Sequence, residues 1–173
     1  MNDSVSSNSA TTAAGLLKPN VRLLELMIPP PAVAALTGAA MWWISVATPL
    51  AQVPEGARIA VALAIASVGG IFVVGAGARF RRARTTFNPA KPQTASSLVT
   101  TGIYQYTRNP MYLALAFVLV AWAVFLSSPW ALAGPVAFVW YISRFQIVPE
   151  ERVLAGLFGT EYSAYQARVR RWL

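Results

Sequence analysis

Long runs without Asp, Glu, Lys or Arg constrain this chain more than any other feature of its sequence. The three runs cover residues 32–51, 59–78 and 111–143. An α-helix needs about 20 apolar residues to cross the hydrocarbon core of a bilayer, and each run is long enough. Hydrophobic residues make up 56% of the chain and charged residues 12%, about half the charged fraction of a typical soluble domain. These runs predict an all-α, polytopic integral membrane protein.

The third run, residues 111–143, is longer than one span and is interrupted at residues 127–129 by Ser-Ser-Pro. Proline lacks a backbone N–H and interrupts helical hydrogen bonding. We therefore expect a helical hairpin with arms at residues 111–126 and 130–143, which brings the number of membrane helices to four. Each arm is short for a full span, so a tilted or shallow arm remains an alternative.

The positions of the basic residues predict an orientation in the membrane. Of the 14 lysines and arginines, only Arg58 falls in the short connection between the first two spans. Loops rich in Lys and Arg stay on the cytosolic side of membranes. We therefore expect both termini and the loop at residues 79–108 to lie in the cytosol, in a protein of a bacterial cytoplasmic membrane.

Two absent residue types exclude several kinds of chemistry. The chain has no cysteine and no histidine, so it has no disulfide, no thiol nucleophile, no Ser-His-Asp triad and no expected metal site. The predicted spans carry no ionisable side chain, which argues against ion transport. The net charge of +8 comes mainly from residues beside the spans, which favours anchoring to an anionic leaflet over binding to nucleic acid.

Outside the spans, the sequence predicts a disordered tail and several cytosolic segments. Residues 1–15 are rich in Ser, Thr, Asn and Ala and form the expected tail, followed by a single membrane domain at residues 16–173. Residues 16–28 alternate charged and apolar side chains and predict a short helix lying in the interface. The loop at residues 79–108 contains several Pro and Gly residues, and we expect an ordered cap there.

Residues 149–173 predict two amphipathic cytosolic helices. Pro149 suits a first helical position, with Glu150 and Glu151 beside the positive end of the helix dipole. Gly159 is placed to end this first helix. The second helix puts four apolar or aromatic residues on one side: Tyr162, Tyr165, Val169 and Trp172.

Small residues recur every four positions in the second predicted span, at Ala62, Ala66 and Gly70. This spacing lets two helices approach closely within lipid. We expect the stripe to face a neighbouring helix.

Polar and aromatic residues gather directly before the predicted hairpin and again after it. Three motifs follow in order: Gly102-Ile-Tyr-Gln-Tyr-Thr-Arg-Asn-Pro-Met-Tyr-Leu-Ala114, Pro149-Glu150-Glu151 and Phe158-Gly-Thr-Glu-Tyr-Ser-Ala-Tyr165. This arrangement resembles the isoprenylcysteine carboxyl methyltransferase family and the related membrane phospholipid methyltransferases. The resemblance covers roughly residues 87–173. It implies an integral membrane enzyme that binds S-adenosylmethionine on its cytosolic side and methylates a lipophilic acceptor, such as the carboxylate of an isoprenylated thiol compound.

The resemblance also implies which residues form the site. The expected cofactor pocket comprises Gly102, Tyr104, Tyr106, Arg108, Asn109, Pro110, Tyr112, Glu150 and Glu151. The expected catalytic residues are Arg108, Asn109 and Arg144. Arg108 suits a carboxylate of the cofactor or acceptor, and Glu150 or Glu151 suits the cofactor's ammonium or ribose hydroxyls. Each of these three residues also has a purely structural interpretation. An arginine beside a span can anchor the protein to the membrane, and acidic residues at the start of a helix can complement its dipole. Arg144 either lines the pocket or ends the span.

Two positions depart from the family pattern, which has histidine and glycine where this chain has Asn109 and Ala114. Asparagine hydrogen-bonds but does not titrate near neutrality, so Asn109 can orient a partner but cannot shuttle a proton. The methyl group of Ala114 narrows any pocket that needs close backbone approach.

Two other classes of protein remain open at this stage. Membrane sterol-type reductases that use NADPH share a similar C-terminal pattern, although they are generally longer. A non-catalytic membrane subunit that keeps the fold is the other, and the replaced histidine and glycine favour it. The acceptor is equally open among a prenylated carboxylate, a phospholipid amine and a small hydrophobic thiol, and the sequence does not indicate an oligomeric state.

Overall fold

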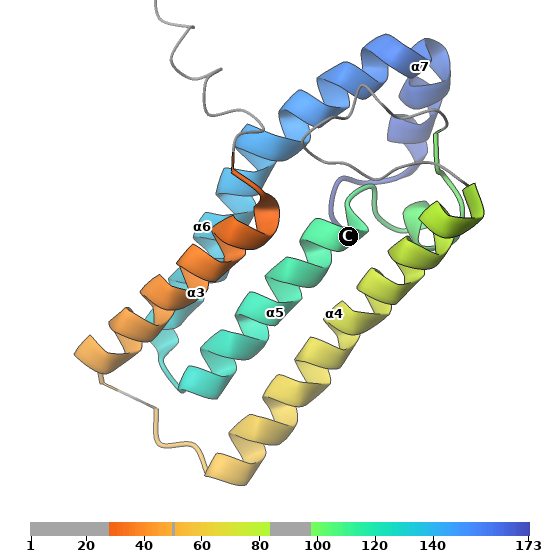
Figure 1. Ribbon diagram of the computed structural model, residues 1–173. Coiled ribbons are helices and arrows are strands. Elements are labelled where there is room, and N and C mark those ends of the chain that lie inside the picture. The colour runs from red at the N-terminus through yellow and green to blue at the C-terminus, as the bar shows by residue number, and fades with distance from the viewer. Residues whose placement is uncertain (1–27, 50, 84–97) are drawn as a thin grey trace, which may run out of the picture.

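The computed structural model describes residues 28–49, 51–83 and 98–173, and every regular element within them is helical (Figure 1). In chain order the elements are α3 (Pro30–Ala47), α4 (Glu55–Ala83), η2 (Gly102–Gln105), α5 (Pro110–Leu126), η3 (Pro129–Leu132), α6 (Ala133–Ile142), η4 (Ser143–Ile147) and α7 (Val148–Arg168). The tail expected at residues 1–15 lies outside the described residues. So do residues 16–27 of the expected interfacial helix and residues 84–97 of the expected cap.

The prediction of an all-α membrane protein is confirmed. Among the described residues, three helical stretches are long and apolar enough to cross a membrane: Pro30–Ala47, Glu55–Ala78 and Pro129–Arg168. A fourth apolar helix, Pro110–Leu126, is shorter, at 17 residues. It rises about 26 Å at 1.5 Å per residue, slightly less than a typical hydrocarbon core.

The first span ends earlier than the sequence predicts. Helix α3 stops at Ala47, and Thr48 is already extended, with φ −128° and ψ 156°. The reason is Pro49, because the residue before a proline is pushed out of the helical region. Helix α4 starts at Glu55, several residues before the predicted span, and continues to Ala83.

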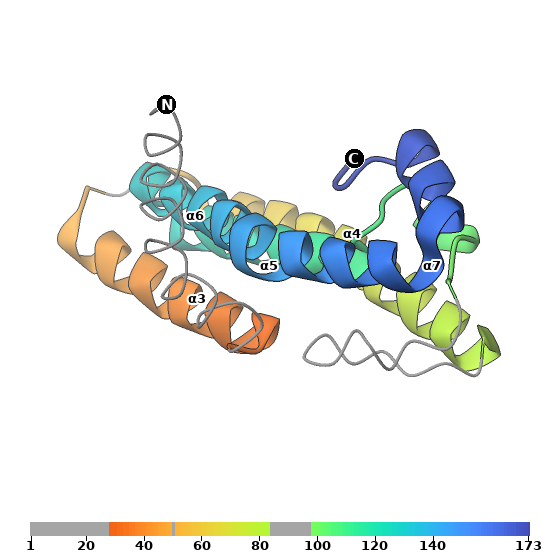
Figure 2. The same ribbon diagram turned by 90° about the horizontal axis from the view of Figure 1, so that it is seen from above.

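Helix α5 lies between α3 and α4 and packs against both (Figures 1 and 2). On the α4 side, the rings of Phe72 and Phe117 stack 5.9 Å apart. A Cβ at Gly69 would lie 3.1 Å from the carbonyl oxygen of Ala114, so the two backbones are close here. The expected packing role of Gly70 is therefore wrong, because Gly70 is exposed and its neighbour Gly69 makes the contact.

Helix α3 packs against α5 and α6. The indole N–H of Trp122 donates to the carbonyl of Gly38 at 3.0 Å, which ties α5 to α3. Met41 is completely buried, and a Cβ at Gly134 of α6 would overlap its Cγ and Sδ. The core cluster at this junction comprises Val33, Met41, Tyr112, Ala116, Leu119, Ala123, Ala131, Phe138, Ile142 and Ile147.

The last span does not end where the sequence predicts. The prediction of a separate helix that begins at Pro149 is wrong, since η3, α6, η4 and α7 run on as one rod (Figure 1). The five residues of η4, Ser143–Ile147, form a π-helical turn. Proline donates no hydrogen bond and crowds the carbonyl one turn earlier, and the wider turn directly before Pro149 accommodates it.

The rod begins with an apolar segment and continues with a segment that carries charged residues. Arg144 is the first charged residue of the rod, so we treat residues 129–143 as the spanning segment and the residues beyond as outside it. Gly159 breaks the rod as predicted, with φ 50° and ψ −120°, a conformation that favours glycine. The remaining residues of α7 fold back over the end of the bundle (Figure 1).

Candidate functional site

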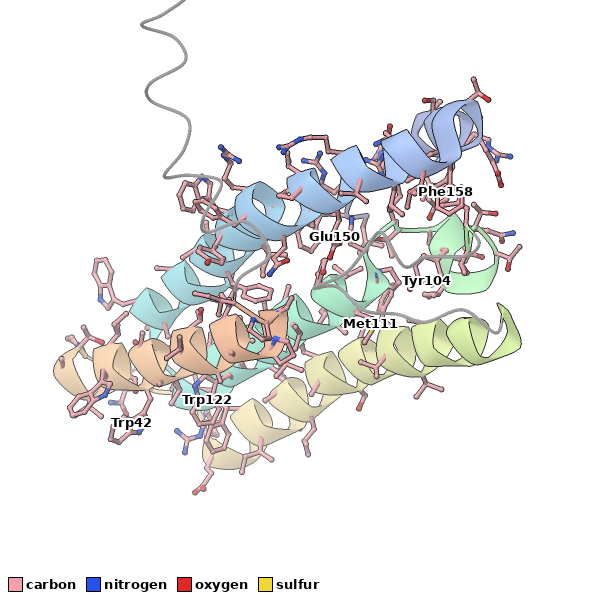
Figure 3. All side chains as sticks on the ribbon, turned by 45° about the horizontal axis from the view of Figure 1, so that its top comes forward. Trp42, Tyr104, Met111, Trp122, Glu150 and Phe158 are labelled. Carbon is pink, nitrogen blue, oxygen red and sulfur yellow. The ribbon has the colours of Figure 1, made fainter. Side chains whose placement is uncertain are left out.

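The candidate site lies at one end of the bundle, where four segments meet. They are residues 98–109, the start of α5, the part of α7 beyond the membrane and residues 169–172 after it. Figure 3 shows Glu150 of α7 and Tyr104 of η2 near Met111, at the start of α5. Residues separated by about forty positions in the sequence are thereby brought together at the membrane boundary.

The short helix η2 buries one tyrosine and exposes another. Gly102 opens it with φ 67°, in the left-handed region that glycine adopts without strain. Tyr104 is buried, and its carbonyl accepts a hydrogen bond from the hydroxyl of Tyr165 at 2.8 Å. Tyr106 is 69% exposed, so the structure does not bring it into the cluster as the sequence predicts.

The turn before α5 holds the C-terminal segment in place. The side-chain amide of Asn109 donates to the carbonyl of Arg171 at 3.0 Å, and the hydroxyl of the fully buried Thr107 donates to the same carbonyl at 3.2 Å. The backbone N–H of Arg108 donates to the carbonyl of Arg170 at 3.0 Å. Pro110 follows as the first residue of α5. Asn109 therefore has an orienting role in this structure, one of the two roles considered from the sequence.

Glu150 is largely buried against a tyrosine at the start of α5. The hydroxyl of Tyr112, which is 4% exposed, donates to Oε1 of Glu150 at 2.5 Å. Burial raises the pKa of Glu150 to about 7; the hydrogen bond from Tyr112 lowers this pKa and the charge of Glu151 raises it. The Glu150 carboxyl is thus poised to gain or lose a proton near neutrality.

Glu151 has different surroundings, because two arginines bind its carboxylate. Arg171 donates from Nη2 to Oε2 at 2.6 Å and from Nε to Oε1 at 3.2 Å, and Nη2 of Arg108 lies 3.1 Å from Oε1. Two positive groups and one negative group leave a net positive charge here. Arg171 therefore supplies one of the two arginine side chains of this cluster.

Arg108 retains hydrogen-bonding capacity. Its side chain is 12% exposed, and within the described part of the chain its buried Nε has no hydrogen-bond partner. A buried guanidinium N–H that donates to nothing is costly. This nitrogen is therefore available to an anionic group of a ligand.

The final turns of α7 form an aromatic wall beside these charges. Tyr162, Tyr165 and Val169 are buried and share one side, as predicted. Burial raises the pKa of Tyr162 to about 12, so its hydroxyl stays neutral. Trp172 does not share that side, because α7 ends at Arg168. Trp172 packs on the main core instead and donates to the hydroxyl of Ser143 at 3.3 Å.

Arg144 is exposed on the π-helical turn, with its guanidinium carbon 5.5 Å from the ring centroid of Phe145. Both readings of Arg144, lining the pocket or ending the span, stay predictions.

Sequence reasoning missed Thr107 and Arg171 as members of this site. The one available signal was the pair of adjacent carboxylates, because two buried negative charges need cationic partners. In the structure both cations bind Glu151, whereas Glu150 is paired with the hydroxyl of Tyr112. The sequence did not indicate which C-terminal arginine supplies the second partner.

Comparison with known proteins gives one family match and one relative. The model of a family described as phospholipid methyltransferase matches residues 57–161, more than half of the chain. An uncharacterized protein of Haemophilus influenzae is 44% identical over 63 residues, which cover 36% of this chain and 100% of that protein. No solved structure matches the chain. The matched region contains Arg108, Tyr112, Glu150 and Glu151 but ends before Arg171.

Proposed function

This chain belongs to the phospholipid methyltransferase family, and we propose that it transfers a methyl group from S-adenosylmethionine to a lipophilic acceptor at the cytosolic face of a membrane. Family membership and the apolar helices make it a membrane protein of a methyltransferase family. Two observations carry the finer proposal. The largely buried carboxyl of Glu150 has a tyrosine hydroxyl but no cation among its hydrogen-bond partners, and the buried Nε of Arg108 has no partner among the described residues.

The residues present fit the charged groups of S-adenosylmethionine. Its carboxylate suits the unpartnered Nε of Arg108, and its ammonium suits Glu150. The exposed ring of Tyr106 points away, whereas buried Tyr104 and Tyr112 lie on the inner side. Of the two carboxylates considered from the sequence, Glu150 is the better candidate, because two arginines already hold Glu151.

When bound, S-adenosylmethionine supplies an electrophilic methyl group on a sulfonium. The chain's own residues then have three tasks. Arg108 fixes a carboxylate through its planar fork, and the hydroxyl of Tyr112 holds the Glu150 carboxyl in one orientation. The aromatic wall and the burial of Glu150 exclude water, so that position and desolvation carry the rate.

The protonation of Glu150 bears on the class of acceptor. An acceptor that is already ionised, such as a carboxylate, needs no general base. An amine must lose a proton before or during methyl transfer, and Glu150, with a pKa of about 7, is suited to take it in place of holding the cofactor's ammonium. We propose a lipophilic acceptor that carries one of these two groups, with the apolar part in the membrane.

Ligand-dependent thermal stability tests this function. The detergent-purified protein is heated with S-adenosylmethionine, with its demethylated product or with NADPH. A ligand at 100 times its dissociation constant stabilises by about 2.7 kcal/mol. We expect a shift with the first two ligands, lost in Glu150→Gln and kept in Glu161→Gln, whose side chain is exposed. A shift with NADPH alone would replace the proposal with a reductase, and no shift with any ligand would favour a non-catalytic subunit.

A further inference from the structure

A broad apolar groove lies between α3 and α4, far from the candidate site. Its volume is about 710 Å³, within the range of roughly 300–1,000 Å³ that is typical of ligand sites. Helix α5 forms the floor, with Leu119 and Trp122, while Trp42 of α3 and Ala66 of α4 stand on opposite sides. All of its lining residues in the described part of the chain are uncharged. Figure 3 shows Trp42 and Trp122 together, at the end of the molecule away from Glu150.

One arginine lies at the outer end of this groove. Arg58 precedes Ile59, which lines the groove, and its guanidinium carbon is 5.6 Å from the ring centroid of Phe125, another lining residue. The Nε atom of Arg58 is buried and has no hydrogen-bond partner among the described residues. Glu55 approaches only to 4.0 Å and its side chain is 77% exposed, so this ion pair is weak and leaves Arg58 able to bind an anion.

The sequence gives Arg58 no basic neighbour at this end of the bundle. Between Arg22 and Arg79, and again between Arg108 and Arg144, the chain contains no other lysine or arginine. The apolar groove thus ends at one positively charged side chain, that of Arg58, near the expected membrane boundary. An amphiphile with a long apolar chain and an anionic head group has the complementary pattern.

We propose that this groove binds an anionic phospholipid, with one acyl chain in the groove and its phosphate on Arg58. The guanidinium fork matches phosphate geometry, and arginine side chains reach the membrane interface from a buried stem. The floor from Leu119 to Phe125 rises about 9 Å, enough to receive the part of an acyl chain nearest the head group. The lipid belongs to the leaflet opposite the Glu150 site.

The bound lipid is distinct from the proposed methyl acceptor. Toward the Glu150 end, α4 and α5 come into direct contact through the stacked rings of Phe72 and Phe117 and the close approach of Gly69 to Ala114. These contacts separate the groove from the candidate site. The lipid therefore fills the space between α3 and α4 and stabilises the bundle.

Retention of lipid by the full chain, measured by native mass spectrometry, tests the proposal. The purified protein is exposed to phosphatidylglycerol or phosphatidylcholine with identical acyl chains, and to free glycerol phosphate. Arg58→Gln removes the cation, with exposed Arg168→Gln as its control. Ala66→Phe fills the groove, with Ala64→Phe as its control, since Ala64 lies on the same helix but is exposed and outside the groove.

The wild type should retain one phosphatidylglycerol about tenfold more strongly than phosphatidylcholine, the factor given by one charge-assisted hydrogen bond of about 1.4 kcal/mol. Arg58→Gln should lose this preference, Ala66→Phe should lose retention of both lipids, and the controls and free glycerol phosphate should show no effect. An unchanged preference in Arg58→Gln or unchanged retention in Ala66→Phe would overturn the proposal. Conversion of a dimer to a monomer by Ala66→Phe would also overturn it, since a second copy would then occupy the groove. Stabilisation by S-adenosylmethionine should persist in all four variants, so the result is independent of the proposed catalytic function.

Discussion

Glu150 and Glu151 are adjacent in the sequence but have opposite electrostatic surroundings. A neutral hydroxyl contacts Glu150, whereas two guanidinium groups contact Glu151. Burial without a cation disfavours the charged form of Glu150, whereas Arg108 and Arg171 form ion pairs with Glu151. One helical turn thus presents both a carboxyl that can exchange a proton and a carboxylate that holds the C-terminal segment.

The raised pKa of Glu150 predicts a pH dependence of stability. Its pKa is about 7 in the folded chain against a reference value of 4.5, so the folded state holds the proton more tightly. The stability that this proton contributes is complete below about pH 4.5 and is lost as the pH rises to about 7. Relative to Glu150→Gln, the wild type should lose on the order of 3 kcal/mol across this window. Melting temperatures at a series of pH values measure the difference, with exposed Glu161→Gln as the control; parallel curves for wild type and Glu150→Gln would contradict it.

Arg171 gives a second prediction at this scale. Arg171→Gln removes two hydrogen bonds from the largely buried Glu151 and leaves Arg108 as its remaining cation. We expect a loss of about 1–2 kcal/mol of stability, partly recovered in Arg171→Lys. Thermal unfolding in detergent measures it, and Arg168→Gln, at an exposed position nearby, should be nearly neutral. Equal losses in both variants would mean that the contact with Glu151 contributes nothing.

The sequence identified most residues of the candidate site but not their pairing. Arg108, Tyr112, Glu150 and Glu151 were all predicted, and the structure places them together. Their division into two pairs depends on residues 169–172 folding back over the turn before α5. No local pattern in the sequence encodes that return, which is why the sequence did not indicate Arg171 as a partner of Glu151.

At the scale of elements, proline is an ambiguous signal. Pro49 ends α3 because a proline disfavours the helical conformation of the residue before it, and the preference of proline for a first helical position suggested a new helix at Pro149. The structure instead keeps one rod and widens the turn before Pro149 into a π-helix. Whether a helix breaks or widens depends on what surrounds it, and here Gln146 and Ile147 in that turn are both buried. The prediction that a helix ends at Gly159 is confirmed, since a residue with this left-handed backbone conformation cannot continue a helix.

Close packing of α3 on α6 gives a prediction for helical glycines. Gly134→Ala should destabilise the protein by about 1–3 kcal/mol, because the new methyl group would overlap the fully buried Met41. Gly70→Ala is the matched control, since nothing lies within 4 Å of its Cβ position. It should be neutral or stabilise by up to about 1 kcal/mol through helix propensity. Melting temperatures of the two variants decide this, and a stable Gly134→Ala would show that α3 shifts away at little cost.

At the scale of the whole molecule, uncharged runs predicted which segments are helical but not which helices are neighbours. Helices α3 and α4 follow each other in the sequence, yet both pack on α5 and leave the groove between them. Spans made of Ala, Val and Leu are apolar on every side, so no amphipathic face indicates a partner. The sequence predicted that Ala62 and Ala66 face a neighbouring helix, but both line the groove.

The orientation of the bundle in the membrane remains a prediction from the positive-inside rule. The proposed function depends on it, because the Glu150 site must face the cytosol. A chain without cysteine allows single-cysteine labelling on a blank background. Gln52, in the connection between α3 and α4, and Ser163, in α7, are both exposed. These two segments lie at opposite ends of the bundle (Figure 1). In spheroplasts, a membrane-impermeant maleimide should label Gln52→Cys, whereas Ser163→Cys should react only after the membrane is permeabilised. The reverse pattern would place Glu150 outside the cell. The site would then be separated from cytosolic S-adenosylmethionine. The reverse pattern would therefore contradict both the predicted orientation and the proposed reaction.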